Sequence, residues 1–153
     1  MSGKGFKTGT YEPRNQAKYK GHYPIKYRSS WELKFMRWCD SNVNVIQWGS
    51  ESVVVPYIDP VKAPSDPDKV RNYILDFTML VKDRMGKLKK YYVEIKPYRQ
   101  VMKPVRKMQS DKTYLYEVLT YARNNAKWKA AYDFSVKKGA EFMLLTEKDF
   151  LKQ

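Results

Sequence analysis

Two neighbouring segments with strand-like alternation constrain the fold of this chain most strongly. Residues 72–81 and residues 88–96 each place apolar side chains on alternating faces, as β-strands do. Asp83-Arg84-Met85-Gly86 lies between them and has turn residues, with Gly86 suited to a positive φ angle. Pro97 ends the second segment. The sequence therefore predicts a β-hairpin within residues 72–96.

Both strands of this hairpin carry charged residues among apolar ones. Asp76 interrupts the first strand, and Glu94 and Lys96 interrupt the second. A three-residue loop pairs Asp83 with Lys87, and in that register Asp76 falls opposite Glu94. A shift by two residues keeps both carboxylates on one face, whereas a shift by one separates them. Facing carboxylates repel each other unless a divalent cation lies between them.

The hairpin residues favour a hard metal ion. His22 is the only histidine, and no cysteine accompanies the carboxylates, so the oxygen ligands suit Mg²⁺ or Mn²⁺ rather than zinc. Such an ion polarises a phosphodiester and lowers the pKa of a bound water. Lys96 would orient that water or neutralise the charge that develops. The alternative is a cross-strand ion-pair cluster in which Asp76 pairs with Lys96.

A helix is expected to begin at Ser29. Ser29-Ser30-Trp31-Glu32 has the capping-box pattern, and an apolar stripe follows at helical spacing (Trp31, Phe35, Trp38 and Cys39). The helix fades near Ser41-Asn42. Glu32 lies at the edge of the stripe and has two interpretations, as a capping residue or as a further acidic site residue. Both hold only if its side chain turns away from the cap.

Shorter elements complete the expected sheet. Strands are predicted at 44–48 and 52–56, with Gly49-Ser50 as the turn between them. Residues 58–69 hold prolines and aspartates without periodicity and predict a surface loop. Residues 142–145 are short, apolar and bounded, which is typical of a buried strand.

Two helices are expected between the hairpin and that last strand. Ser110 caps the first, which Asn124-Asn125 ends, and Gly139 follows the second. Their apolar stripes are Leu115, Val118, Leu119 and Ala122, then Trp128, Ala131, Tyr132 and Ser135. A helical crossover to the last strand predicts an α/β fold: a mixed central β-sheet flanked by helices.

The positive charge of the chain is concentrated in two stretches. The net charge is +14; residues 1–28 hold seven basic residues against one acidic, and residues 82–107 hold ten against two. Residues 1–28 lack helix or strand periodicity and predict an extended basic arm, leaving 29–153 as the folded domain. Tyrosines in the arm either stack on bases or lie on the domain. The predicted phosphate-binding residues are Lys18, Lys20, Arg28, Arg99, Lys103, Arg106 and Lys107.

Composition excludes several classes of protein. One cysteine, Cys39, rules out an internal disulfide framework and fits a reducing compartment. No apolar run approaches the ~20 residues that span a bilayer, so we expect no membrane partner. The basic excess indicates a polyanion such as nucleic acid, although basic runs also serve as solvated faces.

Three motifs together resemble the PD-(D/E)xK nuclease superfamily. They are a helical Glu (Arg28-Ser29-Ser30-Trp31-Glu32), a strand Asp (Ile74-Leu75-Asp76-Phe77) and a following Glu-x-Lys (Val93-Glu94-Ile95-Lys96). The spacing and the tail through Gly139-Ala140-Glu141-Phe142 and Leu145-Thr146-Glu147 look like its TnsA-type, transposon-end endonuclease branch. Over about residues 15–150 the chain is also similar to the head completion nucleases of large tailed bacteriophages.

The resemblance implies a restriction-endonuclease-like core with specific site roles. Asp76 and Glu94 would hold Mg²⁺ or Mn²⁺ with the help of the Ile95 carbonyl. Lys96 would serve the attacking water, and Glu32 would complete the site directly or through water. The proline that often precedes the family's strand Asp is replaced here by Leu75.

The resulting hypothesis is a metal-dependent DNA endonuclease or end-processing nuclease in phage head completion or DNA packaging. It would act in the host cytoplasm during assembly or on the virion, with DNA and phage head or portal proteins as partners. A non-catalytic DNA-binding component of the phage head or neck that retains the nuclease fold is the alternative. A basic RNA-binding module is a third option, but its usual aromatic signatures are not visible.

Overall fold

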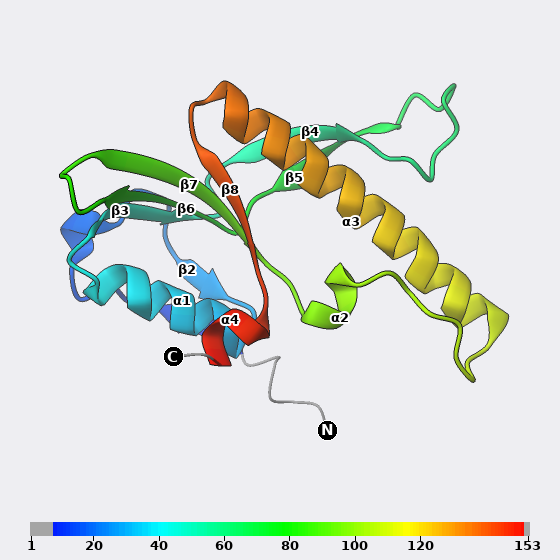
Figure 1. Cartoon of the computed structure of the whole chain (residues 1–153), viewed down its shortest axis with the longest axis horizontal. Helices are drawn as coiled ribbons and strands as arrows, with labels where there is room; N and C mark the ends of the chain where they lie inside the picture. Colours follow the sequence, from blue (N-terminus) through cyan, green and yellow to red (C-terminus); the bar gives the residue numbers. More distant parts are fainter. Residues whose placement is uncertain (1–7, 152–153) are drawn as a thin grey trace.

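A four-stranded mixed sheet forms the centre of the molecule (Figure 1). The structure is a computed structural model and describes residues 8–151. The strand order is β3 (Val45–Ser50), β6 (Phe77–Lys82), β7 (Leu88–Ile95) and β8 (Glu141–Leu145). The first three are antiparallel neighbours, and β8 runs parallel to β7. The predicted mixed sheet flanked by helices is confirmed, as is the crossover to the last strand.

The hairpin has the register that its turn predicts. Phe77 pairs with Val93, and the Asp83 N–H donates to the Lys87 carbonyl at 2.9 Å. Gly86 adopts a φ of 79° in the turn. Continuing this register by one residue places Asp76 opposite Glu94.

The predicted strand 72–81 is not continuous. It divides into β5 (Val70–Ile74), which pairs with β4 (Val54–Ile58) in a separate two-stranded sheet, and β6 in the central sheet. At the break, the Leu75 N–H donates to Val53 and the Asp76 carbonyl accepts from Glu51. The backbone at Asp76 thus leaves one sheet and enters the other, so its side chain lies at their junction. The predicted loop 58–69 is confirmed for residues 59–69, between β4 and β5, whereas Ile58 ends β4.

The predicted turn at Gly49-Ser50 is wrong. Both residues continue β3 and pair with Thr78 and Phe77, and the chain turns at Glu51, which has a φ of 51°. Gly49 is required for packing instead, since a Cβ there would lie 2.7 Å from the Lys20 carbonyl oxygen. β3 and β4 therefore belong to different sheets and form no hairpin.

One face of the central sheet is covered by α1 (Ser30–Ser41) and α4 (Glu147–Leu151). Ser29 caps α1 as predicted, accepting the Glu32 N–H at 3.1 Å. Phe35 and Cys39 of the predicted stripe are buried with strand residues such as Val93, while Trp38 lies at its exposed edge. This packing fixes the start of α1 beside the end of β7.

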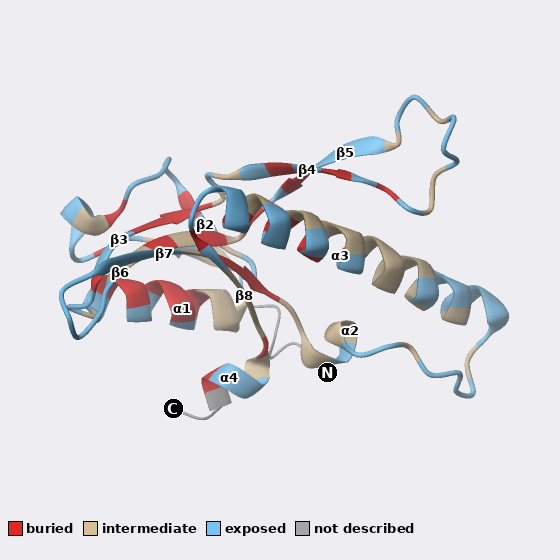
Figure 2. Cartoon of the chain, turned by 45° about the horizontal axis from the view of Figure 1, so that its top comes forward, coloured by how far each residue is buried: buried red, intermediate tan, exposed pale blue. Residues whose placement is uncertain are grey.

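The opposite face is covered by one long helix, α3 (Asp111–Lys137). The predicted break at Asn124-Asn125 is wrong: Asn124 is buried, and the Asn125 amide donates to the Tyr121 carbonyl within the helix. Trp128 and Ala131 of the second predicted stripe pack in the core, as expected. Leu115 of the first stripe is exposed, and Figure 2 shows exposure along the N-terminal half of α3. Gly139 follows the C-terminus of α3, as predicted, and adopts a φ of 68° there.

The first described residues are not an extended arm. β1 (Gly9–Tyr11) pairs with β2 (Ile25–Tyr27). A short 3₁₀ helix, η2 (Gln16–Lys18), lies between the two strands in the sequence. Tyr19, which follows η2, packs on Trp48 in the core. The buried carboxylate of Asp40 accepts hydrogen bonds from the Tyr11 hydroxyl and from two backbone N–H groups of this segment. Residues 1–7 of the expected arm lie outside the described residues. β7 is followed by a short helix, α2 (Tyr98–Val101), and by the linker to α3. Among residues 8–151, no helix is long and apolar enough to cross a membrane.

Candidate active site

A cavity of about 400 Å³ opens where β5 gives way to β6. The four residues predicted to be catalytic all line it, although they come from α1, the strand junction and the end of β7. The complete lining is Arg28, Glu32, Asn72, Tyr73, Ile74, Asp76, Glu94, Ile95, Lys96 and Lys127. Asp76, Glu94 and Lys96 therefore share one face, as the predicted hairpin register requires.

Asp76 and Glu94 are held in different ways. The Asp76 Oδ2 accepts the Ile95 N–H at 2.8 Å, which fixes its carboxylate against β7. Glu94 is only 2% exposed, and its Oε2 lies 3.4 Å from the Lys96 Nζ. Within residues 8–151 its buried Oε1 has no hydrogen-bond partner. Glu94 also lines the cavity, and a carboxylate at a cavity is the kind of group that a hard cation ligates.

Burial and mutual repulsion dominate the electrostatics of the site. Burial raises the pKa of Glu94 to about 8, with the neighbouring Asp76 charge adding to the effect and Lys96 opposing it. Burial also raises the pKa of Asp76, against the Ile95 N–H and Lys96. Glu32 has a raised pKa for the same two reasons, burial and the charge of Asp76. A divalent cation would relieve this repulsion, because it favours the ionised form of every carboxyl it touches.

Glu32 is placed by the cap of α1. Its Oε1 accepts the Arg28 N–H at 3.3 Å, and the Ser29 hydroxyl lies 3.5 Å from its Oε2. The Glu32 side chain thus makes the capping contacts. Among residues 8–151, no group of three or more Asp, Glu, His or Cys side chains lies close enough together to hold a metal ion. Glu32 lines the cavity without joining the Asp76–Glu94 pair directly.

The donor set suits a hard divalent ion. Three carboxylates line the cavity, those of Glu32, Asp76 and Glu94, and its described lining includes no histidine or cysteine. Mg²⁺ typically binds through one or two carboxylates and keeps several waters. Glu32 lines the same cavity, and its contribution to a metal site through water stays a prediction. The Ile95 carbonyl stays a predicted ligand, since the contact seen at Ile95 is made by its N–H.

Three lining residues add polar groups that the sequence pattern does not single out. Tyr73 places a buried hydroxyl beside the Glu94 carboxylate, and Asn72 precedes it on β5. Lys127 comes from α3, more than thirty residues after Glu94. Helical periodicity separates polar from apolar faces but does not say which cation of the polar face meets a distant cavity.

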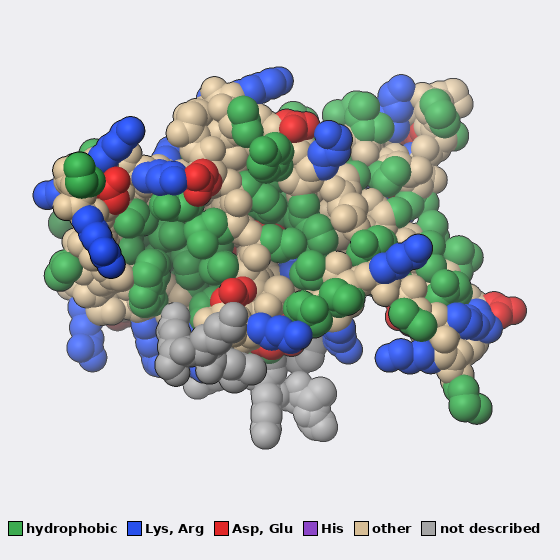
Figure 3. Space-filling view, viewed as in Figure 1, with side chains coloured by type: hydrophobic (Ala, Val, Ile, Leu, Met, Phe, Trp, Pro, Cys, Tyr) green, Lys and Arg blue, Asp and Glu red, His purple; other side chains and the backbone are tan. Residues whose placement is uncertain are grey.

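The predicted phosphate-binding residues fall in different surroundings. Arg28 lines the cavity and forms an ion pair with Glu51. Lys18 donates to the Asp40 and Asn42 carbonyls at 3.0 and 2.8 Å, which ties the N-terminal segment to the end of α1. Lys20 is exposed. On the face shown in Figure 3, Lys and Arg side chains stand apart from one another and form no continuous patch.

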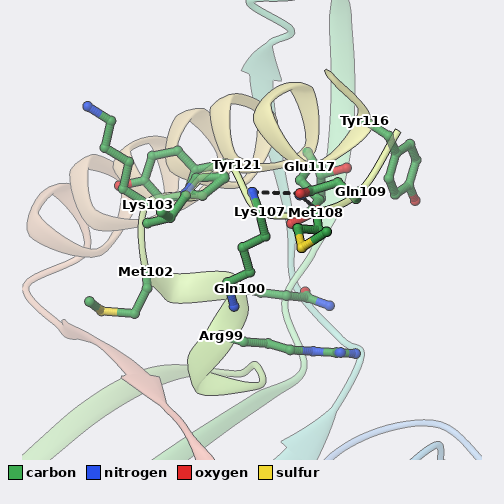
Figure 4. A pocket seen from close by; sticks show the side chains of 13 residues that line it. Arg99, Gln100, Met102, Lys103, Lys107, Met108, Gln109, Tyr116, Glu117 and Tyr121 are labelled. Carbon is green, nitrogen blue, oxygen red and sulfur yellow. Dashed lines mark hydrogen bonds between the residues drawn. The ribbon is translucent and has the colours of Figure 1, made fainter. Parts of the chain in front are cut away.

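Most of the basic linker borders a second hollow of about 740 Å³, between residues 99–109 and the N-terminal half of α3 (Figure 4). Arg99, Lys103 and Lys107 line it together with Met102 and Tyr116. Arg106 does not line it; its guanidinium pairs with Asp111. DNA binding by these linker residues stays a prediction.

Comparison with known proteins gives two matches. Residues 42–147 match the family model described as the TnsA-like endonuclease N-terminal domain. The chain is also 37% identical over 145 residues to the "Head completion nuclease" of Enterobacteria phage T4, a match that covers 92% of this chain and 91% of that protein. No solved structure is significantly similar to the chain.

Proposed function

Because the chain belongs to the TnsA-like endonuclease family, we propose that it is a divalent-metal-dependent nuclease that cuts DNA during completion of a phage head. The 37% identity to a head completion nuclease along nearly the whole chain supports the biological setting. The cavity at the strand junction supports the chemistry. The observation that carries the proposal is the convergence of Asp76, Glu94 and Lys96 in that cavity.

Asp76 and Glu94 would hold Mg²⁺ or Mn²⁺, and when bound the ion supplies Lewis acidity toward the phosphodiester and its attacking water. Asp76 is oriented by the Ile95 N–H, which holds its carboxylate at the cavity beside Glu94. Glu94 would bind the ion in its ionised form, because a cation offsets the burial that raises the pKa of this carboxyl. Glu32 would complete the site through water.

Lys96 is the residue suited to the reacting water. Its Nζ lies at the Glu94 carboxylate and lines the same cavity, so it would donate a hydrogen bond to the water or to the charged phosphate. The alternative is a purely structural ion-pair cluster. The Lys96–Glu94 contact fits both, and the buried Tyr73 hydroxyl beside Glu94 is compatible with both. The activity of folded variants therefore decides between them.

Plasmid nicking tests the proposal. Wild type should nick supercoiled DNA in Mg²⁺ or Mn²⁺ and not in EDTA, while Lys96→Ala and Asp76→Asn should lose at least ~100-fold in rate and keep the wild-type unfolding transition. A contaminating nuclease would cut equally in all preparations. Equal cutting by folded variants would therefore refute the enzyme and favour a non-catalytic DNA-binding component of the phage head or neck.

The setting suggests phage head or portal proteins as partners, met in the host cytoplasm during assembly or on the virion. Asp76→Asn is suited to testing this, because a variant that cannot cut leaves packaged DNA intact. It should co-sediment with isolated phage heads. Absence from the pelleted heads at micromolar concentration would contradict a stable association.

A further inference from the structure

Lys127 is the one cation of the active-site cavity that comes from α3. α3 packs across β4 and β5 (Figure 1). Trp128, the residue that follows Lys127 in the sequence, is buried in the core between them. This packing turns Lys127 toward the junction where Asp76 leaves β5, and it lines the cavity with Glu94 and Lys96. The position is thus fixed by the helix core rather than by a flexible loop.

Two buried tyrosines hold the Lys127 ammonium group. Its Nζ lies 5.8 Å from the centroid of the Tyr57 ring and 5.7 Å from that of the Tyr73 ring. These tyrosines are diagonal neighbours on β4 and β5, since Tyr57 pairs with Arg71. Ring faces attract a cation without neutralising it, so the charge stays available to an anion.

The other cations around it on α3 are already paired. Arg123 binds the buried Asp59, and Lys129 forms an ion pair with Asp133. Lys127 has no carboxylate within ion-pair distance among residues 8–151. Burial and the charge of Lys96 lower the pKa of Lys127, and the charge of Glu94 only partly opposes this shift. A half-buried unpaired cation beside a second one forms a receptor for a negative group.

We propose that Lys127 binds a backbone phosphate of the DNA that occupies the active-site cavity. This inference rests on the proposed nuclease function, and it assigns to α3 a direct part in holding the substrate. Lys96 and Lys127 then play different roles. Lys96 serves the metal and its water from beside Glu94, whereas Lys127 contacts the phosphodiester and leaves the metal site intact.

The test compares Lys127→Met and Lys127→Arg with Lys129→Met as a matched control. Lys129 lies two residues further along α3, with its side chain 80% exposed and outside the cavity. Lys127→Met keeps an aliphatic stem over the tyrosines, so the variant should keep the wild-type unfolding transition and Mn²⁺ affinity. Single-turnover cutting of a duplex in Mn²⁺ should slow by about 100-fold, with Lys127→Arg within about 10-fold of wild type.

Binding of the same duplex in EDTA provides a readout independent of cutting. Lys127→Met should bind ~3–10-fold more weakly than Lys129→Met, with a shallower dependence on salt. Wild type that fails to cut would refute the proposed function, and the affinity comparison would still decide the role of Lys127. Equal affinities of the two variants, or a loss of Mn²⁺ binding in Lys127→Met, would overturn the inference.

Discussion

Neutralising Glu94 should stabilise the metal-free protein above neutral pH. Glu94 is buried beside Asp76, and its pKa is raised from an ordinary value of 4.5 to about 8. The folded state therefore holds this proton more tightly than the unfolded chain, and stability is lost as the pH rises from about 4.5 to about 8. The variant Glu94→Gln has no charge to bury and escapes this loss.

The magnitude follows from the size of that change. At about 1.4 kcal/mol per pH unit, moving a pKa from 4.5 to about 8 corresponds to roughly 5 kcal/mol of unfolding free energy at alkaline pH. Loss of the Lys96 contact offsets part of the gain. We expect Glu94→Gln to exceed wild type by about 2–4 kcal/mol at pH 8 in EDTA, and to match it near pH 4.

Urea unfolding followed by tryptophan fluorescence at several pH values measures this difference. Exposed Glu12, replaced by Gln, is the control for removing a carboxylate elsewhere. Adding Mn²⁺ should then stabilise wild type and the control but not Glu94→Gln, which has lost a ligand. If Glu94→Gln gains nothing at pH 8, or gains equally at pH 4 and pH 8, a buried, mutually repelling carboxyl pair is not what the site contains.

Further predictions concern cutting and folding. Lys96→Met should lower the cutting rate at saturating Mn²⁺ while Mn²⁺ affinity, measured by calorimetry, stays within about 3-fold, since Lys96 is proposed to act on the water; a matching loss of affinity would show that it only shapes the site. Asp40→Ala should lower the unfolding free energy by about 2–4 kcal/mol, because three part-buried hydrogen bonds anchor residues 11–15 to its carboxylate. A loss below about 0.5 kcal/mol would contradict that anchoring. Gly49→Ala should cost about 1–3 kcal/mol, because the new Cβ meets a backbone oxygen at 2.7 Å, and unchanged denaturant midpoints would refute the close approach.

The hairpin register was predictable because it depends on local chemistry. Asp83 and Gly86 fix a tight turn, and a turn sets the pairing of every residue that follows. The turn and the alternation of the two strands were enough to predict that Asp76 and Glu94 share a face. The two strands supply most of the proposed metal site, so this part of the site could be read from about twenty residues.

What could not be predicted depends on pairing between distant segments. The alternation from Tyr73 to Phe77 continues without interruption, and only the separate partners of β5 and β6 reveal that the strand divides there. Asn124-Asn125 has low helix propensity, yet α3 continues because its C-terminal half packs on the sheet. Likewise, the segment around Tyr19 and Ile25 shows no strand periodicity in the sequence. Both side chains are nevertheless buried, and they make the basic N-terminal segment part of the core.

The division of the strand at Asp76 also explains why the site lies where it does. In a continuous strand the Ile95 N–H would pair with a backbone carbonyl, and the Asp76 carboxylate would stand above an unbroken sheet. Here β5 leaves the central sheet, and the Asp76 carboxylate accepts that N–H in its place. The departure of β5 opens the cavity that α1 borders with Glu32 and α3 borders with Lys127. A change that closes the break should therefore abolish metal binding even with every acidic residue retained.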